Sequence, residues 1–510
     1  MGRRKAEQDE LFTPTARGAG HKFYEALSQL LRDADFDVEV ERLCAPYYAP
    51  DDGRGGRSIP PGVFFRMMLV GYFEGISSER GIVWRCGDSM SLRDFLGLPN
   101  HKAVPNQSTL SRTRYRLPLK VFDEVFRLVL RVVDENGLFK GKVFGVDSTY
   151  LKADASMKTI VRKDTGENHR EYIKRIAAED LSNDKVSDDK ASDDKVSDEK
   201  ACDDKASDDK VSDDKASDDK ASDDKAASTS KKVSTEEAVR YDRKRKKTTS
   251  NKDWASKSDS DARIVRMKNG TTRLGYKAEH VVDMDTGAIV ALTLFKGNEG
   301  DTSTLMRSLQ KAEENLAPLG GLPNPDDNDG EAWHRPIKGE LVADKGYHKV
   351  SVLDELKKEG WRTYIPERKH RGKRRFDDKG GASASQAFHQ NRARTRRKKG
   401  KEHQRRRGEF VERPNQHLYE RGQKLRELSL VGQENNAKRL AVQAMGFNLG
   451  LVMRKNVGAG TPKGLWLALS ALLAAICVAA RNVEMNLGRT FRYAVWRQER
   501  RRKGAGASVC

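Results

Sequence analysis

Acidic residues in two apolar, strand-like runs are the first feature of this sequence that could carry chemistry. Asp147 lies inside VFGVDSTYL and Asp344 ends ELVADKGY, where a charge is costly unless it is paired or bound to metal. A third carboxylate could come from GEFVERPNQHLYE, which offers Glu409, Glu412 and Glu420. Three converging carboxylates can bind Mg²⁺, and two such ions about 3.5–4 Å apart can activate a water or a 3′-hydroxyl for phosphoryl transfer. From spacing alone, the alternative is that these Asp residues merely cap turns.

Other kinds of catalytic or metal site are missing from the sequence. No GxxxxGK[ST] loop, HExxH helix, GxSxG elbow or Cys/His zinc spacing occurs. The five Cys residues lie far apart and include no CxxC pair, which disfavours a disulfide framework and predicts a reducing compartment. The first residues lack the apolar core of a signal peptide, so we expect a cytoplasmic protein.

The charge balance favours a polyanionic partner. The 510 residues include 97 Lys and Arg against 76 Asp and Glu, a formal net charge of +21. Each phosphate neutralised by Lys or Arg releases condensed counterions, so this excess favours binding to nucleic acid. Charged residues make up 34% of the chain and the mean hydropathy is −0.79, which predicts that part of the chain stays unfolded.

The elements that would position the acids alternate between strands and helices. Residues 272–284 and 288–298 are separated by Asp285-Thr-Gly287, which predicts a β-hairpin. The further elements that we expect are strands at 142–153 and 361–366, a short buried strand that runs into a loop over 339–349, and helices at 301–317 and 350–360. The order β–β–β–α–β–α–β predicts an α/β domain built on a mixed sheet.

The N-terminal region, residues 1–140, is expected to be helical. Pro60 and Pro61 open one helical pattern, and Ser91 to Asp94 form a capping-box-like start of another. Asn106 could cap a strongly basic helix over 106–117, and a longer apolar helix is expected over 119–134. The basic side chains of the capped helix are Arg112, Arg114 and Arg116. These helices fit a helix-turn-helix-like unit that reads DNA, or alternatively a bundle with a solvated basic face.

Two segments interrupt the α/β pattern. Residues 182–226 are nine pentapeptides of the type SDDKA, whose period fits neither helix nor strand. With the basic linker that follows, 182–250 is predicted to be disordered. Residues 367–408 are dense in Arg and Lys and are predicted to be a basic loop that tracks a phosphate backbone, or alternatively a solvated surface.

An apolar run and a lone tryptophan each allow two interpretations. Residues 464–480 fall short of the ~20 residues that span a bilayer, so within the C-terminal segment 456–510 we expect a buried or partner-packing helix rather than a membrane span. Trp254 could stack on a displaced base, but a core position is the stronger expectation.

Several strings together resemble the DDE-type transposases of bacterial insertion sequences. They are GVDSTYLKADASMKTIVRKDTGE, SNKDWASKSDSDARIVRMKNGTTRLGYKAEHVVDMDTGAIVALTLFKGNEGDTSTL, VADKGYHKVSVL and VERPNQHLYERGQKLRELSLVGQENNAKRLAVQAMGFNLGLVMRK. The resemblance covers most of residues 60–455 in one order of motifs. It implies a ribonuclease H-like catalytic fold over 141–181 and 251–455, and it implies a DNA-binding N-terminal region.

The resemblance also implies a catalytic and metal-binding triad. The first Asp falls on Asp147, the second on Asp344 and the final Glu on Glu412, with Asn415 where an aromatic or apolar residue is commoner in relatives. By the same resemblance, the side chains that would contact DNA phosphates are Arg426, Asn435, Lys438 and Arg439, with a solvated helix face as the alternative. Lys345 and Tyr347 follow the second Asp and could position the scissile phosphate, or alternatively form a structured turn with Gly346.

The implied activity is Mg²⁺-dependent cutting and joining of double-stranded DNA, with Mn²⁺ as a substitute. Activated water would nick the element end, and the freed 3′-hydroxyl would then attack target DNA. Holding two terminal inverted repeats together implies a homodimer or higher assembly in the bacterial cytoplasm, associated with the nucleoid and not with a membrane. The alternative from another class is a catalytically decayed transposase that binds DNA without cutting it.

Overall fold

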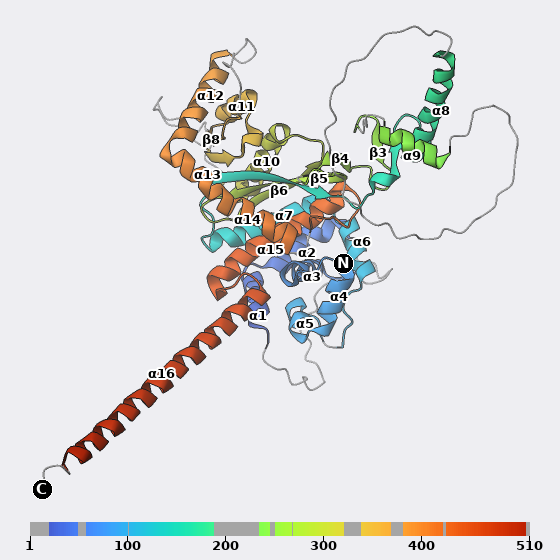
Figure 1. The fold of residues 1–510 in the computed structure, drawn as a ribbon. Coiled ribbons are helices and arrows are strands. Elements are labelled where there is room, and N and C mark those ends of the chain that lie inside the picture. Colours follow the sequence, from blue (N-terminus) through green and yellow to red (C-terminus); the bar gives the residue numbers. More distant parts are fainter. Residues whose placement is uncertain are drawn as a thin grey trace. The chain divides into compact units, whose positions relative to one another are not determined.

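The structure is a computed structural model of the 510-residue chain (Figure 1). It describes residues 20–48, 58–99, 101–187, 234–244, 250–267, 269–320, 338–368, 381–421 and 425–505. The chain divides into two compact units, one made of 1–155 with 258–510 and the other of 156–257. The six-stranded sheet belongs to the first unit, so the second unit is an insertion between two segments of one domain.

A mixed sheet forms the centre of the first unit. Its order is β6–β5–β1–β7–β8, in which β6, β5 and β1 run antiparallel while β7 and β8 run parallel to β1. The strands are β1 (Val143–Lys152), β5 (Thr272–Asp283), β6 (Ile289–Lys296), β7 (Gly339–Ala343) and β8 (Trp361–Tyr364), and β4 (Arg263–Arg266) pairs with the start of β5. Three antiparallel strands followed by two parallel ones confirm the predicted ribonuclease H-like mixed sheet.

Helix α10 (Asp301–Leu316) covers one face of this sheet as its apolar spacing predicts. Leu305, Leu309, Ala312 and Leu316 are all buried in a core shared with Val146 of β1 and Ala343 of β7. Helix α11 (Val350–Lys358) follows β7 and adds Val352, Leu353 and Leu356 to the same core. The side chains of Val146 and Ala343 therefore define the α10 face of the sheet.

The predicted basic loop over 367–408 is wrong where the structure describes it. Residues 381–410 form two helices, α12 (Gly381–Arg396) and α13 (Lys398–Phe410), while 369–380 lie outside the described residues. Ala384, Ala387 and Phe388 are buried, and Asn391 bonds both the N–H and the C=O of Ile365. Arg, Lys, Gln and Ala all favour helix, so sparse apolar anchors are enough to fold a segment that is otherwise basic.

The N-terminal region is helical, as predicted. Its helices are α1 (Lys22–Asp33), α2 (Phe36–Cys44), α3 (Pro61–Glu74), α4 (Glu79–Asp88), α5 (Met90–Leu96), α6 (Gln107–Arg116) and α7 (Leu119–Glu135). The Asn106 cap is confirmed, since Asn106 Oδ1 accepts from Thr109 N at 2.9 Å. The predicted start at Ser91 is wrong: Ser89 caps α5, because its Oγ accepts from Leu92 N.

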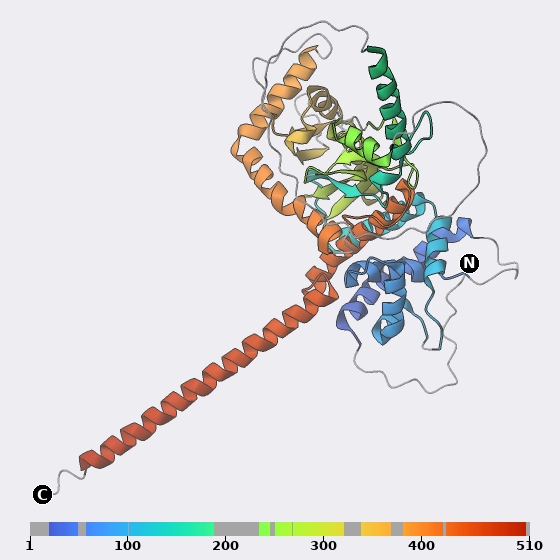
Figure 2. The ribbon, with the colours of Figure 1, turned by 45° about the vertical axis from the view of Figure 1, so that its right-hand side comes forward.

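Helix α15 (Gln433–Val457) packs against both the N-terminal helices and the sheet and so joins them (Figure 2). Asn448 bonds both backbone groups of Ile289 on β6, at 2.9 and 2.8 Å. On the α3 side, a Cβ added to Gly446 would lie 2.4 Å from the Tyr72 ring, so only glycine allows this approach. Buried bonds to the sheet and a close contact with α3 make the helical region and the sheet one packed body.

The second unit contains β2 (Ile160–Arg162), β3 (Trp254–Ser256), α8 (His169–Ser187) and α9 (Thr235–Lys244). Trp254 is buried and packs edge-on against Tyr172, which confirms the core interpretation of this tryptophan. The predicted disorder over 182–250 is wrong for 182–187, the first residues of the array, which continue α8, and for 235–244, which form α9; both helices are rich in helix-favouring Glu, Lys, Ala and Arg. The rest of the repeat array lies outside the described residues.

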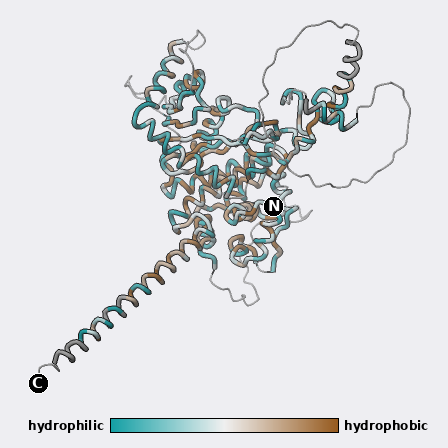
Figure 3. Tube along the Cα trace, viewed as in Figure 1, coloured by the Kyte–Doolittle hydropathy of each residue, from teal (hydrophilic) through white to brown (hydrophobic). Residues whose placement is uncertain are grey.

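Helix α16 (Pro462–Ala505) contains the apolar run and exposes it. Trp466, Leu469, Leu473 and Ile476 are each exposed, so the expectation that this run is buried within the chain is wrong (Figure 3). Among the described residues, the segment Gln433–Val483 holds one stretch that could cross a membrane by length and composition, with mean hydropathy 1.9 and 6% of the stretch buried. The partner-packing interpretation of the run stays a prediction.

Candidate active site

Asp147 and Asp344 lie side by side on the face of the sheet opposite α10. In the parallel pair β1–β7, Val146 is the partner of Ala343, so the two Asp residues follow at the same level. Side chains alternate along a strand, and Asp344 keeps an extended backbone (φ −73°, ψ 163°), so both acids point away from the α10 face. Neighbouring strands are about 4.8 Å apart, so the two residues extend from adjacent positions on the same face.

A close backbone approach brings Glu412 to the same face. A Cβ added to Gly145 of β1 would lie 2.1 Å from Val411 Cγ2, so the chain before Glu412 packs directly onto the strand. His280, the partner of Asp147 on β5, is fully buried, and its Nε2 lies 2.8 Å from the Val411 carbonyl oxygen. A carbonyl only accepts, so Nε2 donates. Burial lowers the pKa of His280, against the opposing effect of the Asp147 charge, and thus favours this neutral, donating form.

Two side chains connect Glu412 and its helix to Asp147. Arg407 Nη1 lies 3.6 Å from Asp147 Oδ1, and its Nη2 donates to Glu412 Oε1 at 3.0 Å. Asn415, on α14 (Glu412–Gln416) with Glu412, donates from Nδ2 to Asp147 Oδ2 at 2.9 Å. One arginine thus bridges the first and third predicted acids.

Of the other two predicted third acids, Glu420 has a different partner. It bonds Arg426, which in turn donates to Thr149 Oγ1 at 2.9 Å, two residues beyond Asp147 on the same face of β1. Glu409 is exposed on α13. The geometry therefore favours Glu412 as the acid that faces Asp147.

The donor set suits a hard divalent cation, with one rearrangement. Carboxylate oxygens are the ligands that Mg²⁺ and Mn²⁺ prefer. The carboxylates of Asp147, Asp344 and Glu412 belong to the same face of the sheet. Among the described residues, no three His, Cys, Asp or Glu side chains are close enough to hold a metal ion as they stand. The Arg407 guanidinium lies between Asp147 and Glu412 and supplies the positive charge there. For these three carboxylates to hold a metal, Arg407 would have to turn aside.

Three of the predicted DNA contacts are wrong because their side chains are buried. Arg114 pairs with Glu79, and Lys438 Nζ donates to the Arg114 carbonyl oxygen at 3.2 Å. Arg439 donates to Ser429 Oγ at 2.7 Å and to the Ser77 carbonyl oxygen, and burial lowers its pKa to about 10. Lys438 thus ties α15 to α6, and Arg439 ties it to the segment between α3 and α4. A sequence shows the charge but not which side chains the fold covers.

The remaining predicted DNA contacts are accessible. Arg112 and Arg116 are exposed on α6, where Arg116 stacks over the Tyr48 ring. Lys345 is exposed beside Asp344, and Arg426 is half-buried near Thr149. Their role in binding DNA stays a prediction.

Residues 345–347 form a structured turn. Asp344 Oδ1 accepts from Lys345 N at 2.7 Å, and Tyr347 is buried with its hydroxyl donating to Glu279 at 3.0 Å. The turn interpretation is therefore confirmed for Tyr347, which cannot reach a phosphate. Asp344 both caps this turn and lies beside Asp147.

Sequence reasoning missed the residues that support the acids. Arg407 was hidden within a basic segment, and His280 and Gly145 carry no signal of their own in a single sequence. Asn415 did give a signal, because it departs from the apolar residue expected there. The structure gives this unusual asparagine a role, because the Asn415 amide donates a hydrogen bond to Asp147.

Two family models match the chain. Residues 15–116 match the transposase domain DUF772, and residues 234–449 match the transposase DDE domain. The second match contains Asp344 and Glu412, and Asp147 lies before it. No curated protein and no solved structure matches the chain.

The fold and the two matches define the class of the protein. A mixed sheet of ribonuclease H-like order, with one acid on β1 and another just after β7 and with a helical region before it, is consistent with the DNA-transposing enzymes that the two matches indicate. The chain belongs to the DDE-type transposases of insertion sequences.

Proposed function

We propose that this transposase cleaves DNA strands at the ends of its insertion sequence and joins the freed 3′ ends to target DNA, in a reaction that depends on Mg²⁺ or Mn²⁺. The observation that supports the proposal is the common placement of Asp147, Asp344 and Glu412. Asp147 lies on β1 and Asp344 directly follows the paired strand β7, and Val411, the residue before Glu412, packs against Gly145 of β1.

Each side chain has a distinct task in this proposal. Asp147, Asp344 and Glu412 would hold the cation, which when bound would lower the pKa of an attacking water or 3′-hydroxyl and stabilise the leaving oxygen. Asn415 orients one Asp147 oxygen through its hydrogen bond. Arg407 neutralises two carboxylates until it turns aside, and the exposed Lys345 is placed to contact a DNA phosphate.

The partners follow from the same reaction. We propose that the enzyme binds double-stranded DNA at the terminal repeats and at the target, and that it acts as a homodimer or larger assembly. A cytoplasmic, nucleoid-associated location without a membrane partner fits a DNA substrate.

A catalytically decayed transposase that only binds DNA is the second candidate. It is favoured by one observation, the position of Arg407 between two of the three acids. It predicts DNA affinity without any metal-dependent nick.

Substitution of the acids tests the proposal. Asp147→Asn and Asp344→Asn should each reduce nicking of a duplex that carries the element's terminal repeat by roughly 10³-fold, because metal-held charge stabilisation is worth several kcal/mol. Binding of the same duplex without metal should change little. Asp154→Asn, an exposed carboxylate just beyond β1, is the matched control and should nick like the wild type.

Three results would overturn the proposal or part of it. If Asp147→Asn still nicks at the wild-type rate in Mg²⁺, the site assignment is wrong. If the wild type binds but nicks in neither Mg²⁺ nor Mn²⁺, the decayed alternative holds. If ends are cut but never joined, the chain is a nuclease.

A further inference from the structure

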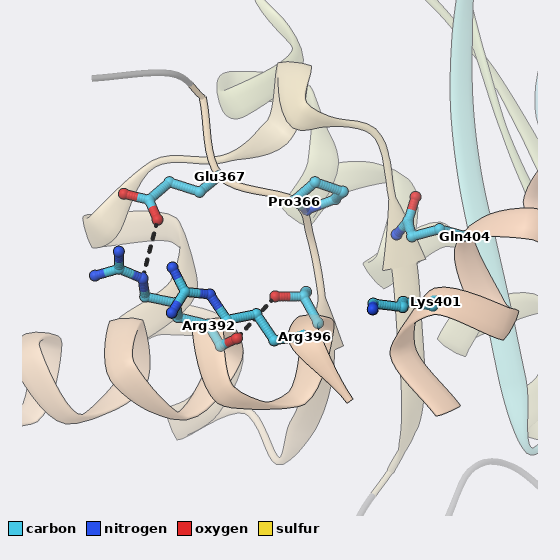
Figure 4. Close-up of a pocket in the computed structure, with 7 residues that line it drawn as sticks. Pro366, Glu367, Arg392, Arg396, Lys401 and Gln404 are labelled. Atoms are coloured by element: carbon cyan, nitrogen blue, oxygen red, sulfur yellow. Dashed lines mark hydrogen bonds and ion pairs between the residues drawn. The ribbon is translucent and has the colours of Figure 1, made fainter. Parts of the chain in front are cut away.

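A basic cleft lies next to the acidic face of the sheet, between α12, α13 and the segment after β8. It has a volume of about 420 Å³, within the ~300–1,000 Å³ typical of ligand sites. Its lining residues are Pro366, Glu367, Arg392, Thr395, Arg396, Lys401 and Gln404 (Figure 4). Three of these side chains are cations and one is an anion, so the cleft suits an anionic ligand.

The cations of the cleft are only partly neutralised. Arg392 Nε lies 3.4 Å from the Glu367 carboxylate, and this buried nitrogen makes no hydrogen bond among the described residues. Arg396 and Lys401 are exposed and line the cleft from two different helices, α12 and α13 (Figure 4). The cleft therefore offers donors on two sides to one incoming group.

Helix α13 connects this cleft to the acids. Gln404 Nε2 donates to the Tyr364 carbonyl oxygen at 2.7 Å and lies 3.4 Å from that of Ala343, the residue before Asp344. Arg407, which contacts Asp147, follows Gln404 by three residues. With a rise of 1.5 Å per residue, Lys401 and Arg407 are about 9 Å apart along the helix axis.

We propose that this cleft binds a backbone phosphate of the DNA strand within about three nucleotides of the phosphate at the acids. A distance of about 9 Å corresponds to about three nucleotides, because one DNA strand rises by ~3.4 Å per nucleotide. The inference rests on the proposed function for its substrate, and it goes further by assigning a second phosphate site with named donors. A strand held at both places is fixed in position and direction across Asp344.

Salt dependence of DNA binding tests the cleft without any cleavage. The probe is a fluorescein-labelled 24-base-pair duplex of arbitrary sequence, titrated with the full chain at several KCl concentrations without divalent metal. Removing the cations that neutralise one phosphate reduces the slope of log K against log[KCl] by about 0.9. The double variant Arg396→Ala/Lys401→Ala should therefore reduce the magnitude of the slope by about 0.9, the change expected for one phosphate.

The control removes the same charge outside the cleft. Lys398→Ala/Arg405→Ala changes two exposed cations of α13 that do not line the cleft, and its slope should equal that of the wild type. All four positions are exposed, so thermal unfolding should confirm that both variants fold.

Two outcomes would overturn the inference. One is an unchanged slope in the cleft variant. The other is an equal reduction of the slope in the control, which would mean that the overall positive potential of α13 attracts DNA and that the cleft is not a specific phosphate site. Neither depends on catalysis. If the wild type nicks DNA but the slope of the cleft variant equals that of the wild type, only the cleft proposal is refuted. If the slope of the cleft variant is reduced but the wild type does not nick DNA, the cleft proposal is supported and the proposed catalysis is refuted.

Discussion

Replacing Gly145 with Ala should disturb the active site without touching any acid. The new Cβ would lie 2.1 Å from Val411 Cγ2 and 3.0 Å from Met284 Cγ, whereas carbon atoms pack at about 3.5–4.0 Å. Val411 is fully buried and β-branched, so it must move back by roughly 1.5 Å. Glu412 follows Val411 directly and should move with it.

The expected size of the effect has two parts. Overpacking a core costs about 1–3 kcal/mol, and a shift of about 1 Å at a catalytic group can cost 10²-fold in rate. We therefore expect Gly145→Ala to unfold at a temperature lower by a few degrees at most, because 1 kcal/mol shifts Tm by about 2–4 °C in a domain of 150–250 residues and by less in a larger one. Nicking of a terminal-repeat duplex should fall about 100-fold, with DNA binding nearly unchanged.

A double-mutant cycle identifies the contact responsible. Val411→Ala removes the clashing Cγ2 and should destabilise the wild type by about 2 kcal/mol as a cavity. In the Gly145→Ala background the same change should cost much less and should restore part of the nicking. Additive effects, with a coupling below about 0.5 kcal/mol, would refute the claim that this contact positions Glu412.

Two further predictions concern stability and thiol reactivity. Asp37 holds the buried Arg66 through two hydrogen bonds of 2.9 and 2.8 Å, so Asp37→Ala should lower the free energy of unfolding by about 3–5 kcal/mol, measured in urea. Burial raises the pKa of both Cys44 and Cys86 to about 12, so at pH 8 only about 10⁻⁴ of each is thiolate. Peptide mapping after iodoacetamide treatment should show the exposed Cys477 modified more than 100-fold faster.

Each of these predictions has its own control. Glu39 pairs with Arg42 at 2.8 Å on the surface, so Glu39→Ala should cost at most about 1 kcal/mol. A decrease as large as that of Asp37→Ala would mean that burial is not the cause. Modification of Cys44 in the folded protein as fast as that of Cys477 would contradict the burial of its thiol.

The sheet and the first two acids could be predicted because their signal is local. Apolar runs mark β1 and β7, and a charge inside such a run is conspicuous at Asp147 and Asp344. The antiparallel hairpin follows from the turn at Gly287, whose φ of 83° favours glycine. Pairing of neighbouring strands then brings the two acids together.

The rest depends on contacts between distant parts of the chain. Arg114 meets Glu79 across 35 residues and Lys438 across 324, so nothing in their local sequence distinguishes them from solvated cations. The helical state of 381–410 depends on sparse anchors such as Phe388 against the core. The position of Glu412 depends on the close contact of Val411 with Gly145, which is possible because glycine has no side chain. A single sequence does not reveal this contact.

The insertion that carries the pentapeptide array begins and ends at neighbouring points of one strand. Ala153 N donates to the Leu274 carbonyl oxygen at 2.9 Å, and Tyr276 donates to Asp259 at 2.7 Å, so the flanks of 156–257 are tied two residues apart on β5. Doubling the length of a flexible connection costs only about 0.6 kcal/mol. Each unit of the array is encoded by fifteen nucleotides, so copying errors that add or drop whole units preserve the reading frame. We expect the gene to tolerate such expansions and contractions, and a reporter domain fused at this point to leave the enzyme intact.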